Sequence, residues 1–188
     1  LSWAAEVSLC ERAPRAQISG TGPLPYNYRV IDGHIHAGGH PLNPRFSNSD
    51  TAVRSILDYL KSRGVTTVID LENTRRIHGR YAALLKQEGI ALLHVPMSAA
   101  KVPTFAEWPQ IKKAMDEPVY IHCQWGADRT GIVIAKYLVD EKGYSVPDAL
   151  KAVQSGGSHA GRIGGFKPAY YGKPFQKFLG GNSPAHNI

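Results

Sequence analysis

The sequence contains few cysteines: Cys10 and Cys123 are the only two among 188 residues. Small secreted proteins that depend on disulfides carry several cysteines, usually in even number and at regular spacing. The sequence therefore excludes a disulfide framework. We expect Cys10 to be an inert thiol near the surface or the terminus, with a redox-regulatory bond between Cys10 and Cys123 as the alternative.

Long hydrophobic stretches are also absent. No run reaches the ~18 apolar residues that a membrane-spanning helix needs, so no transmembrane segment is expected. The chain begins at Leu1 without a methionine, a start that either a removed leader peptide or a trimmed chain would give. We predict a periplasmic or secreted bacterial location, with a cytoplasmic location as the alternative.

Basic runs are missing even though the formal net charge is +7. Lysines and arginines are scattered, and no aromatic and basic recognition module is present, so we do not expect a nucleic-acid partner. A positive field raises the local concentration of negative ligands. The charge therefore favours a phosphorylated partner, either a small molecule or a phosphoprotein.

The composition suits one folded domain. Hydrophobic residues make up 43% of the chain and charged residues 20%, which is ordinary for a globular protein. Residues 1–27 contain several prolines and glycines and little periodicity. We therefore predict an extended N-terminal arm over 1–27 and the folded domain over 28–188.

Strand and helix patterns alternate along the chain. Apolar residues at i, i+3, i+4 and i+7 follow Asn48 and Ser49, either of which can cap a helix that Gly64 would end. The β-branched run 65–71 indicates a parallel strand that is buried on both faces. We expect an α/β fold: a single domain with a mostly parallel central sheet of four or five strands flanked by helices. Further strands are expected at 90–95, before Cys123 and on both sides of Gly33, and further helices at 74–88, after Thr104, after the loop at 123–128 and after Ser145.

One stretch, VYIHCQWGADRTG at 119–131, combines an apolar strand, a cysteine and an arginine at the start of a helix. The five residues between Cys123 and Arg129 let the backbone N–H groups turn inward, and the helix adds the positive end of its dipole. Such a loop binds phosphate and stabilises a thiolate. We therefore predict that Cys123 is a nucleophile; a buried free cysteine beside a surface arginine is the alternative.

The segment HCQWGADRTG resembles the HCxxGxxR(S/T)G loop of the cysteine-dependent protein tyrosine phosphatase superfamily. The layout of the chain is most similar to the compact dual-specificity branch and its phytase-like relatives, over about 28–155. The resemblance implies that Cys123 attacks phosphorus, that Arg129 grips two phosphate oxygens, and that Thr130 donates a hydrogen bond to the sulfur. It also implies that neither a metal nor another cofactor takes part.

The other residues of this loop are predicted to surround the substrate. By resemblance, His122 supports the loop from the strand side, and Gln124, Gly126 and Ala127 form its wall. Trp125 is unusually large for this position. It would wall the pocket or stack on a ring of the substrate.

The loop that follows the strand at 90–95 has no carboxylate. Members of the family normally draw an aspartate general acid from it, whereas this sequence has Ser98, Ala99 and Ala100 there. We predict that Asp128 is the acid, because some relatives with an aspartate directly before the loop arginine are thought to use it. A loop-shaping hydrogen bond or a salt bridge is the alternative role of Asp128, and a substrate phosphate or a water is the alternative proton source.

Several basic residues are candidates for the rim of the site. Arg75, Arg76, His78 and Arg80 follow the end of a predicted strand, where ligands of open α/β sheets gather. Lys101 lies beside the missing acid and would hold a second phosphate. The alternative for all of them is an ordinary solvated surface.

Asp32, His34 and His36 form an HxH pattern that also occurs in metal-dependent amidohydrolases. The segment is more similar to the hairpin that precedes the helices in the phosphatase family, with histidines in place of tyrosine and arginine. We therefore expect no metal at this pair.

Two classes of function remain open. The first is an enzyme that hydrolyses phosphate monoesters through a cysteinyl-phosphate intermediate. Its predicted substrate is inositol polyphosphate or another non-protein polyanion, and protein tyrosine or dual-specificity phosphatase activity is the alternative. The second class is a pseudophosphatase that binds phosphate but lacks an efficient acid.

Overall fold

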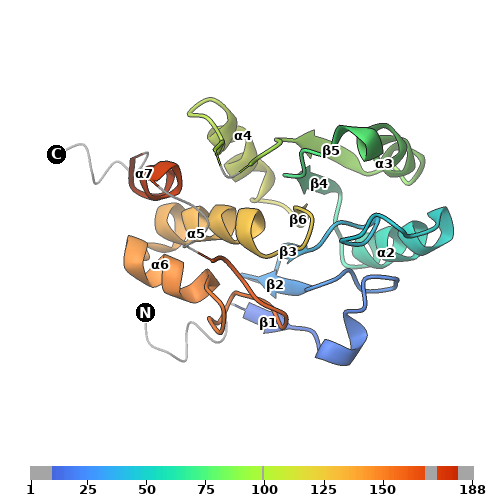
Figure 1. Cartoon of the computed structure of the whole chain (residues 1–188), viewed down its shortest axis with the longest axis horizontal. Helices are drawn as coiled ribbons and strands as arrows, with labels where there is room; N and C mark the ends of the chain where they lie inside the picture. Colours follow the sequence, from blue (N-terminus) through green and yellow to red (C-terminus); the bar gives the residue numbers. More distant parts are fainter. Residues whose placement is uncertain (1–9, 99, 168–172, 182–188) are drawn as a thin grey trace.

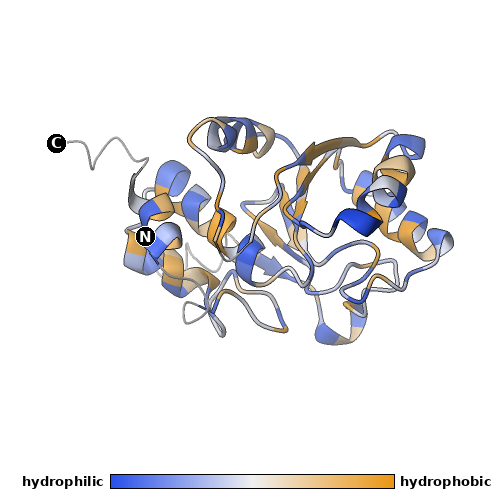
Figure 2. Ribbon diagram, turned by 45° about the horizontal axis from the view of Figure 1, so that its top comes forward, coloured by the Kyte–Doolittle hydropathy of each residue, from blue (hydrophilic) through white to orange (hydrophobic). Residues whose placement is uncertain are grey.

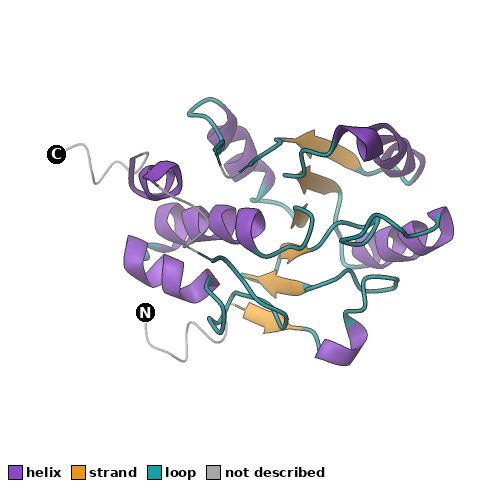
Figure 3. Cartoon of the chain, viewed as in Figure 1, coloured by secondary structure: helices purple, strands orange, loops and turns teal. Residues whose placement is uncertain are grey.

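The structure is a computed structural model that describes residues 10–98, 100–167 and 173–181. The described residues form one six-stranded sheet in the order β1-β2-β3-β6-β4-β5, with helices on both sides (Figure 3). β1, β2 and β3 pair antiparallel, whereas β3, β6, β4 and β5 run parallel. The strands are β1 (Cys10–Arg12), β2 (Arg29–Ile31), β3 (Ile35–Gly38), β4 (Thr67–Asp70), β5 (Ala91–His94) and β6 (Val119–His122).

The helices cover the two faces of the sheet separately (Figure 1). On one face α2 and α3 enclose a hydrophobic core, and on the other face a second core lies under α4, α5, α6 and α7. The strand β6 serves both cores, because Val119 and Ile121 face one and Tyr120 faces the other. The helical segments are η1 (Arg15–Gln17), α2 (Asp50–Ser62), α3 (Arg75–Gln87), α4 (Glu107–Ala114), α5 (Asp128–Lys142), α6 (Val146–Val153) and α7 (Lys173–Gly181).

The predicted fold class is confirmed, although the sheet has six strands where four or five were predicted. The additional strand is β1, in which Cys10 pairs with Ile31 at the edge of the sheet. A strand of three residues is too short to produce the alternation by which strands are recognised, so the sequence indicated only an extended arm.

Local signals at the helix ends give the expected contacts. The side chain of Ser49 accepts a hydrogen bond from the N–H of Ala52 (3.2 Å) and begins α2. Thr104 and Glu107 form a reciprocal capping box, with distances of 3.0 and 3.1 Å. Gly143 ends α5 in the left-handed conformation (φ 71°), which glycine adopts readily.

Hydrophobic residues concentrate in the strands, and the helices carry both kinds of residue (Figure 2). Near the C-terminus, Phe166, Phe175 and Phe178 are buried in the core that also contains residues of α5. None of the helices within the described ranges has the length and hydrophobicity that crossing a membrane requires.

Parallel pairing brings three strand ends to one edge of the sheet. Asp70 at the end of β4 lies opposite His122 on one side and opposite His94 on the other. The loops that follow β6, β4 and β5 therefore leave the sheet side by side. In open α/β sheets this is the edge at which ligands bind.

Candidate active site

The loop between β6 and α5 holds the sulfur of Cys123 at its base. Cys123 is only 2% exposed, and the hydroxyl of Thr130 donates a hydrogen bond to its Sγ at 3.2 Å. Thr130 lies in the first turn of α5, whose N-terminus begins at Asp128. The sulfur therefore lies in front of a helix N-terminus, where partial positive charge stabilises an anion.

Gly126 gives this loop its tight path. Its φ of 73° is left-handed, and a Cβ there would lie 2.2 Å from the carbonyl carbon of Gly38. Its carbonyl oxygen accepts hydrogen bonds from Arg29 Nη1 (2.6 Å) and from Asn27 Nδ2 (3.3 Å). On the other side, the N–H of His40 donates to the carbonyl of Gln124 (3.0 Å). The loop is thus fixed by segments from the beginning of the chain.

Arg29 is a buried cation behind the loop that the sequence analysis did not single out. Burial lowers the pKa of its guanidinium to about 10, although the thiols of Cys10 and Cys123 act to raise it. Arg29 therefore stays charged at neutral pH. Its hydrogen bond to the carbonyl of Gly126 fixes the loop, and its positive charge lies behind the loop where an anion would bind. The only sequence signal was its place in the hairpin segment of the resemblance.

His122 is fully buried and neutral. Burial lowers its pKa, while nearby Asp70 acts in the opposite direction. Its Nδ1 donates to the carbonyl of Cys123 (2.9 Å), so its Nε2 accepts from the hydroxyl of Tyr81 (2.7 Å). The ring therefore connects the end of β6 to α3 and orients the backbone at Cys123.

Arg129 is held by Glu72, which the sequence analysis did not identify. Arg129 Nη2 lies 3.2 Å from Glu72 Oε2, and Nη1 lies 3.4 Å from Glu72 Oε1 and 3.3 Å from the carbonyl of Met97. The side chains are 14% and 3% exposed, respectively. Such a two-pronged pair fixes the plane of the guanidinium. Nη1 also lies 3.4 Å from Asn73 Oδ1.

Glu72 is ionised in this arrangement. Burial acts to raise its pKa, but Arg129 and the hydrogen bonds that Glu72 accepts from the backbone of Asn73 and the side chain of Thr74 lower the pKa below its ordinary value. The carboxylate therefore combines two functions, since it closes the start of α3 and positions the loop arginine. A glutamate two residues after a buried strand carries no distinctive sequence signal.

Asp128 lies at the first position of α5, and its Oδ1 accepts a hydrogen bond from the N–H of Lys167 (2.7 Å). Burial raises its pKa, whereas Lys167 and Arg129 act to lower it. A raised pKa suits an acid, and the bond to Lys167 suits the alternative role of shaping the loop. Both roles predicted for Asp128 are thus compatible with its surroundings.

The loop after β5 turns back on itself, with Ser98 and Lys101 forming an isolated antiparallel bridge. The ammonium of Lys101 donates to the carbonyl of Pro96 (3.1 Å) and lies 3.8 Å from Glu107. Glu107 itself closes the capping box of α4. Among the described residues, Lys101 therefore contacts its own loop and α4.

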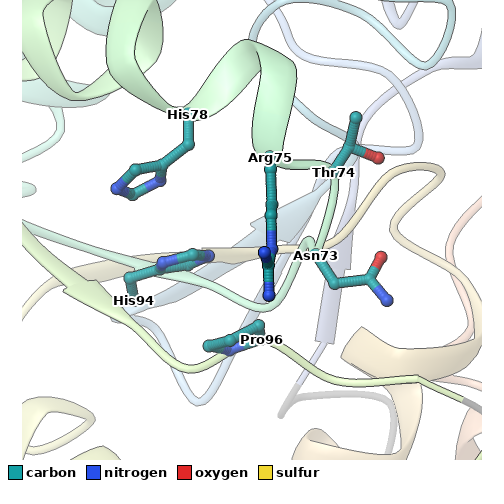
Figure 4. A pocket seen from close by; sticks show the side chains of 6 residues that line it. All are labelled: Asn73, Thr74, Arg75, His78, His94 and Pro96. Carbon is teal, nitrogen blue, oxygen red and sulfur yellow. The ribbon is translucent and has the colours of Figure 1, made fainter.

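The three arginines predicted for the rim lie in different surroundings. Arg75 lines a cavity beside Asn73 and Pro96 (Figure 4). The guanidinium of Arg76 instead lies over the ring of Phe46, 5.6 Å from its centroid. Arg80 pairs with Asp50 at 2.7 Å and joins α3 to α2. Only Arg75 of these three arginines lines that cavity.

Trp125 is 42% exposed and meets Tyr26 edge to face, with their centroids 5.6 Å apart. A second cavity of about 270 Å³ lies here, and Ala127 and Asp128 also line it. Trp125 thus contributes to the wall of this cavity, and its predicted contact with the substrate stays a prediction.

The histidines of the hairpin have other partners. His36 Nδ1 lies 2.6 Å from the hydroxyl of Tyr28, and burial lowers the pKa of His36 to about 4, with Arg63 and His34 contributing in the same direction. His34 lies 2.8 Å from the carbonyl of Asp32 and 2.6 Å from that of Met115. Both rings are therefore occupied with structural hydrogen bonds. Cys10 is a free, half-buried thiol whose pKa is raised by burial, which fits the inert role predicted for it.

Two groups of side chains have a composition that a metal ion could use. His40, Asp70 and His122 are all buried behind the loop, and Asp70 also lies near His78 and His94 at the cavity of Arg75. His122 uses both ring nitrogens in hydrogen bonds. The first group is therefore better explained as a support for β6.

Comparisons with known proteins agree with this geometry. A family model described as Tc-R-P, "Polymorphic toxin system, DSP-PTPase phosphatase", matches residues 45–143. An mRNA-capping enzyme from Danio rerio is 33% identical over 107 residues, which cover 50% of this chain. The chain spans only 17% of that protein's length.

Solved structures share the fold. TpbA of P. aeruginosa is 20% identical with a TM-score of 0.57, and the match covers 86% of this chain and 91% of that one. Tk-PTP is 18% identical with a TM-score of 0.57, over 79% and 90% of the two chains. PTPMT1 is 20% identical with a TM-score of 0.55, over 79% and 91%. At these identities the likeness establishes the fold.

The fold and the loop at 123–130 define a phosphatase of the cysteine-dependent protein tyrosine phosphatase superfamily. Within it, the chain belongs to the DSP-PTPase phosphatase family of polymorphic toxin systems.

Proposed function

We propose that the protein hydrolyses phosphate monoesters through a cysteinyl-phosphate intermediate, without a metal, and that its substrate is inositol polyphosphate or another non-protein polyanion. The observation that carries the proposal is the contact of Cys123 Sγ with Thr130 at the base of a loop whose arginine is fixed by Glu72. A nucleophile, an oriented cation and a helix N-terminus then converge on one phosphoryl group.

The reaction has two displacements. The thiolate of Cys123 forms a bond to phosphorus while the bond from phosphorus to the ester oxygen breaks, and the leaving oxygen takes a proton from Asp128. Arg129 and the loop N–H groups stabilise the charge on the phosphoryl oxygens. Water then attacks phosphorus, the bond to sulfur breaks, and Asp128 accepts the proton of the water. Thr130 stabilises the departing thiolate through its hydrogen bond.

The choice of substrate rests on the net charge of the chain and on the ligands found in solved structures with a similar fold. The net charge of +7 favours a polyanion, and a structure of PTPMT1 with a TM-score of 0.55 contains PI(5)P. A TpbA structure with a TM-score of 0.60 contains pTyr, which supports phosphotyrosine protein as the alternative substrate. The bond between Asp128 and Lys167 supports the remaining alternative, a pseudophosphatase with slow turnover.

A phosphate-release panel tests these proposals. Inositol hexakisphosphate, phosphotyrosine and phosphoserine peptides, and p-nitrophenyl phosphate would be compared by kcat/KM. We expect the highest value for inositol hexakisphosphate. A higher value for the phosphotyrosine peptide would replace this substrate with phosphoprotein, and tight binding without any turnover would establish the pseudophosphatase.

Replacing Asp128 with asparagine tests the acid. We expect kcat to fall by about 10²-fold or more on an alkyl phosphate, whose leaving oxygen needs a proton, and by less than about tenfold on p-nitrophenyl phosphate. Because the acid works only while it is protonated, the fall of wild-type kcat at rising pH should disappear in the variant. Equal losses on both esters would instead assign Asp128 to the shape of the loop.

The predicted periplasmic or secreted location, with a cytoplasmic one as the alternative, stays a hypothesis. The family's description as part of polymorphic toxin systems is compatible with action outside the producing cell. Cell fractionation with an antibody against the chain would decide between the two.

A further inference from the structure

A cavity of about 460 Å³ lies at the sheet edge beside the phosphate loop (Figure 4). It is formed between the start of α3 and the segment that follows β5, where ligands of such sheets bind. Arg75 extends into it in Figure 4, between His94 and Asn73. Its lining is made of Asn73, Thr74, Arg75, His78, His94 and Pro96.

The chemistry of this lining suits an anion. It offers one guanidinium, two imidazoles, an amide and a hydroxyl, and it includes no carboxylate. The first turn of α3 also contains no acidic residue. Thr74 does not cap this helix, because its hydroxyl donates to Glu72 Oε1 at 3.1 Å. Glu72 Oε1 accepts from the N–H groups of Asn73 and Thr74, so the positive partial charge that α3 can offer lies on the N–H groups of its first turn.

The two histidines leave hydrogen-bonding capacity unused. His78 Nδ1 is buried and has no hydrogen-bond partner among the described residues. His94 Nε2 lies 2.8 Å from the carbonyl of Glu72 and must donate to it, so Nδ1 of the neutral ring is an acceptor and donates to an anion only once the ring is protonated. A buried polar atom without a partner is costly, and a phosphate oxygen would satisfy His78 Nδ1 in the tautomer that carries its proton there.

The cavity shares a wall with the catalytic arginine. Asn73, which lines the cavity, has its Oδ1 3.4 Å from Arg129 Nη1. Glu72 lies directly before Asn73 and holds the same guanidinium. A molecule with one phosphoryl group in the loop of Cys123 can therefore place a neighbouring group in the cavity.

We propose that this cavity binds a second phosphate group of the substrate, with Arg75 as its main cation, with His78 and the first turn of α3 as further donors, and with His94 as a donor once its ring is protonated. The proposal rests on the proposed function and deepens it. It makes the substrate a compound with at least two closely spaced phosphates, as distinct from a phosphotyrosine peptide.

A divalent cation on Asp70, His78 and His94 is the competing occupant. The two imidazoles stack face to face, with centroids 4.2 Å apart and planes at 20°. His94 Nε2 already donates to the carbonyl of Glu72, so an ion would have to bind His94 through Nδ1. The guanidinium of Arg75 lines the same cavity and disfavours a second cation there.

The kinetic test uses Arg75→Ala, with Lys86→Ala as the control, since Lys86 is an exposed lysine on the same helix. For each variant, kcat/KM would be measured on inositol hexakisphosphate and on p-nitrophenyl phosphate. We expect Arg75→Ala to lower the ratio of the two values by about tenfold or more, and Lys86→Ala to leave the ratio within about twofold of wild type. An unchanged ratio in Arg75→Ala would overturn the proposal.

The binding test needs no turnover. Calorimetry would measure inorganic tripolyphosphate and inorganic phosphate binding to Cys123→Ser and to Cys123→Ser/Arg75→Ala. The expected result is that Arg75→Ala weakens tripolyphosphate about tenfold and inorganic phosphate much less. Equal weakening of both would show that Arg75 acts through the loop, and so would overturn the second site.

Zn²⁺ titration of Cys123→Ser decides between the two occupants. The cavity would be a cation site, and the proposal would be wrong, if adding His78→Ala to Cys123→Ser abolished Zn²⁺ binding but left the affinity for tripolyphosphate unchanged. If instead tripolyphosphate binding depended on Arg75 but wild-type protein hydrolysed no ester, the second site would stand and the proposed function would fail.

Discussion

Replacing Cys123 with serine is expected to abolish phosphate release, with kcat lower by at least about 10⁴-fold on every ester of the panel. Cys123 is 2% exposed, and its sulfur lies at the base of the loop, where it accepts a hydrogen bond from the hydroxyl of Thr130. A serine hydroxyl in the same place stays protonated at neutral pH and does not attack phosphorus. Release of inorganic phosphate at enzyme concentrations high enough to detect one turnover would measure the loss.

The same variant should still bind phosphate. The contacts of Arg129 with Glu72 and the hydrogen bonds from Arg29 to the carbonyl of Gly126 do not involve the sulfur. We therefore expect the affinity of Cys123→Ser for inorganic phosphate to change by less than about tenfold, because the cradle of N–H groups remains. Loss of binding together with turnover would mean that the substitution had disturbed the loop.

Cys10→Ser is the matched control. Cys10 lies in β1 at the sheet edge and is a free thiol. Its substitution should leave kcat within about twofold of wild type. Mass spectrometry of quenched wild-type protein should find one added phosphoryl group on the peptide that contains Cys123. An adduct on any other residue would contradict the proposed intermediate.

The parts of the site that follow one another in the chain could be predicted from the sequence. The strand, loop and helix at 119–142 lie in one continuous stretch, as do the cap at Ser49 and the capping box at Thr104 and Glu107. Local hydrogen bonding determines these features, so local patterns reveal them.

The parts that depend on tertiary contacts could not be predicted. Arg29 meets Gly126 from 97 positions away, and Glu72 meets Arg129 from 57 positions away. Nothing beside either residue in the sequence indicates that partner. The same reason explains Arg76, which was predicted for the rim but lies over Phe46. On a helix, neighbouring residues point about 100° apart, so Arg75 and Arg76 reach different surroundings.

Replacing Glu72 with glutamine is expected to lower kcat by about 10²-fold while Cys123 stays intact. The variant keeps the size of the side chain but removes the charge that holds both guanidinium nitrogens of Arg129. A displacement of a positioning group by about 1 Å can cost this much in rate. Because Arg129 also binds phosphate in the ground state, KM should rise, although by less than kcat falls.

The difference in unfolding free energy between the wild type and this variant should depend on pH in a defined direction. The folded-state pKa of Glu72 is lower than its ordinary value of 4.5, although burial alone would raise it. Its ionised form therefore contributes stability above the ordinary value, and this contribution is lost as pH falls through the lowered folded-state pKa. We expect a loss of about 3 kcal/mol in unfolding free energy at pH 7, since one member of a buried pair is left without its partner. At a pH below the lowered folded-state pKa of Glu72, the loss of unfolding free energy should shrink toward zero.

Glu117→Gln separates this effect from a general change of charge, since Glu117 is an exposed carboxylate beyond α4. Denaturant unfolding at pH 7 and at acidic pH, with kcat and KM at neutral pH, should show both defects in Glu72→Gln and neither in Glu117→Gln.

A stability loss with normal kcat would mean that Met97 and Asn73 suffice to hold Arg129 and that Glu72 serves only the start of α3. A loss of kcat with unchanged stability would mean that the charge of Glu72 is needed only to hold Arg129. The amide of glutamine would then accept the hydrogen bonds from Asn73 and Thr74 equally well. Losses of both kcat and unfolding free energy would show that the carboxylate of Glu72 has two functions. In its ionised form it both closes the start of α3 and orients Arg129.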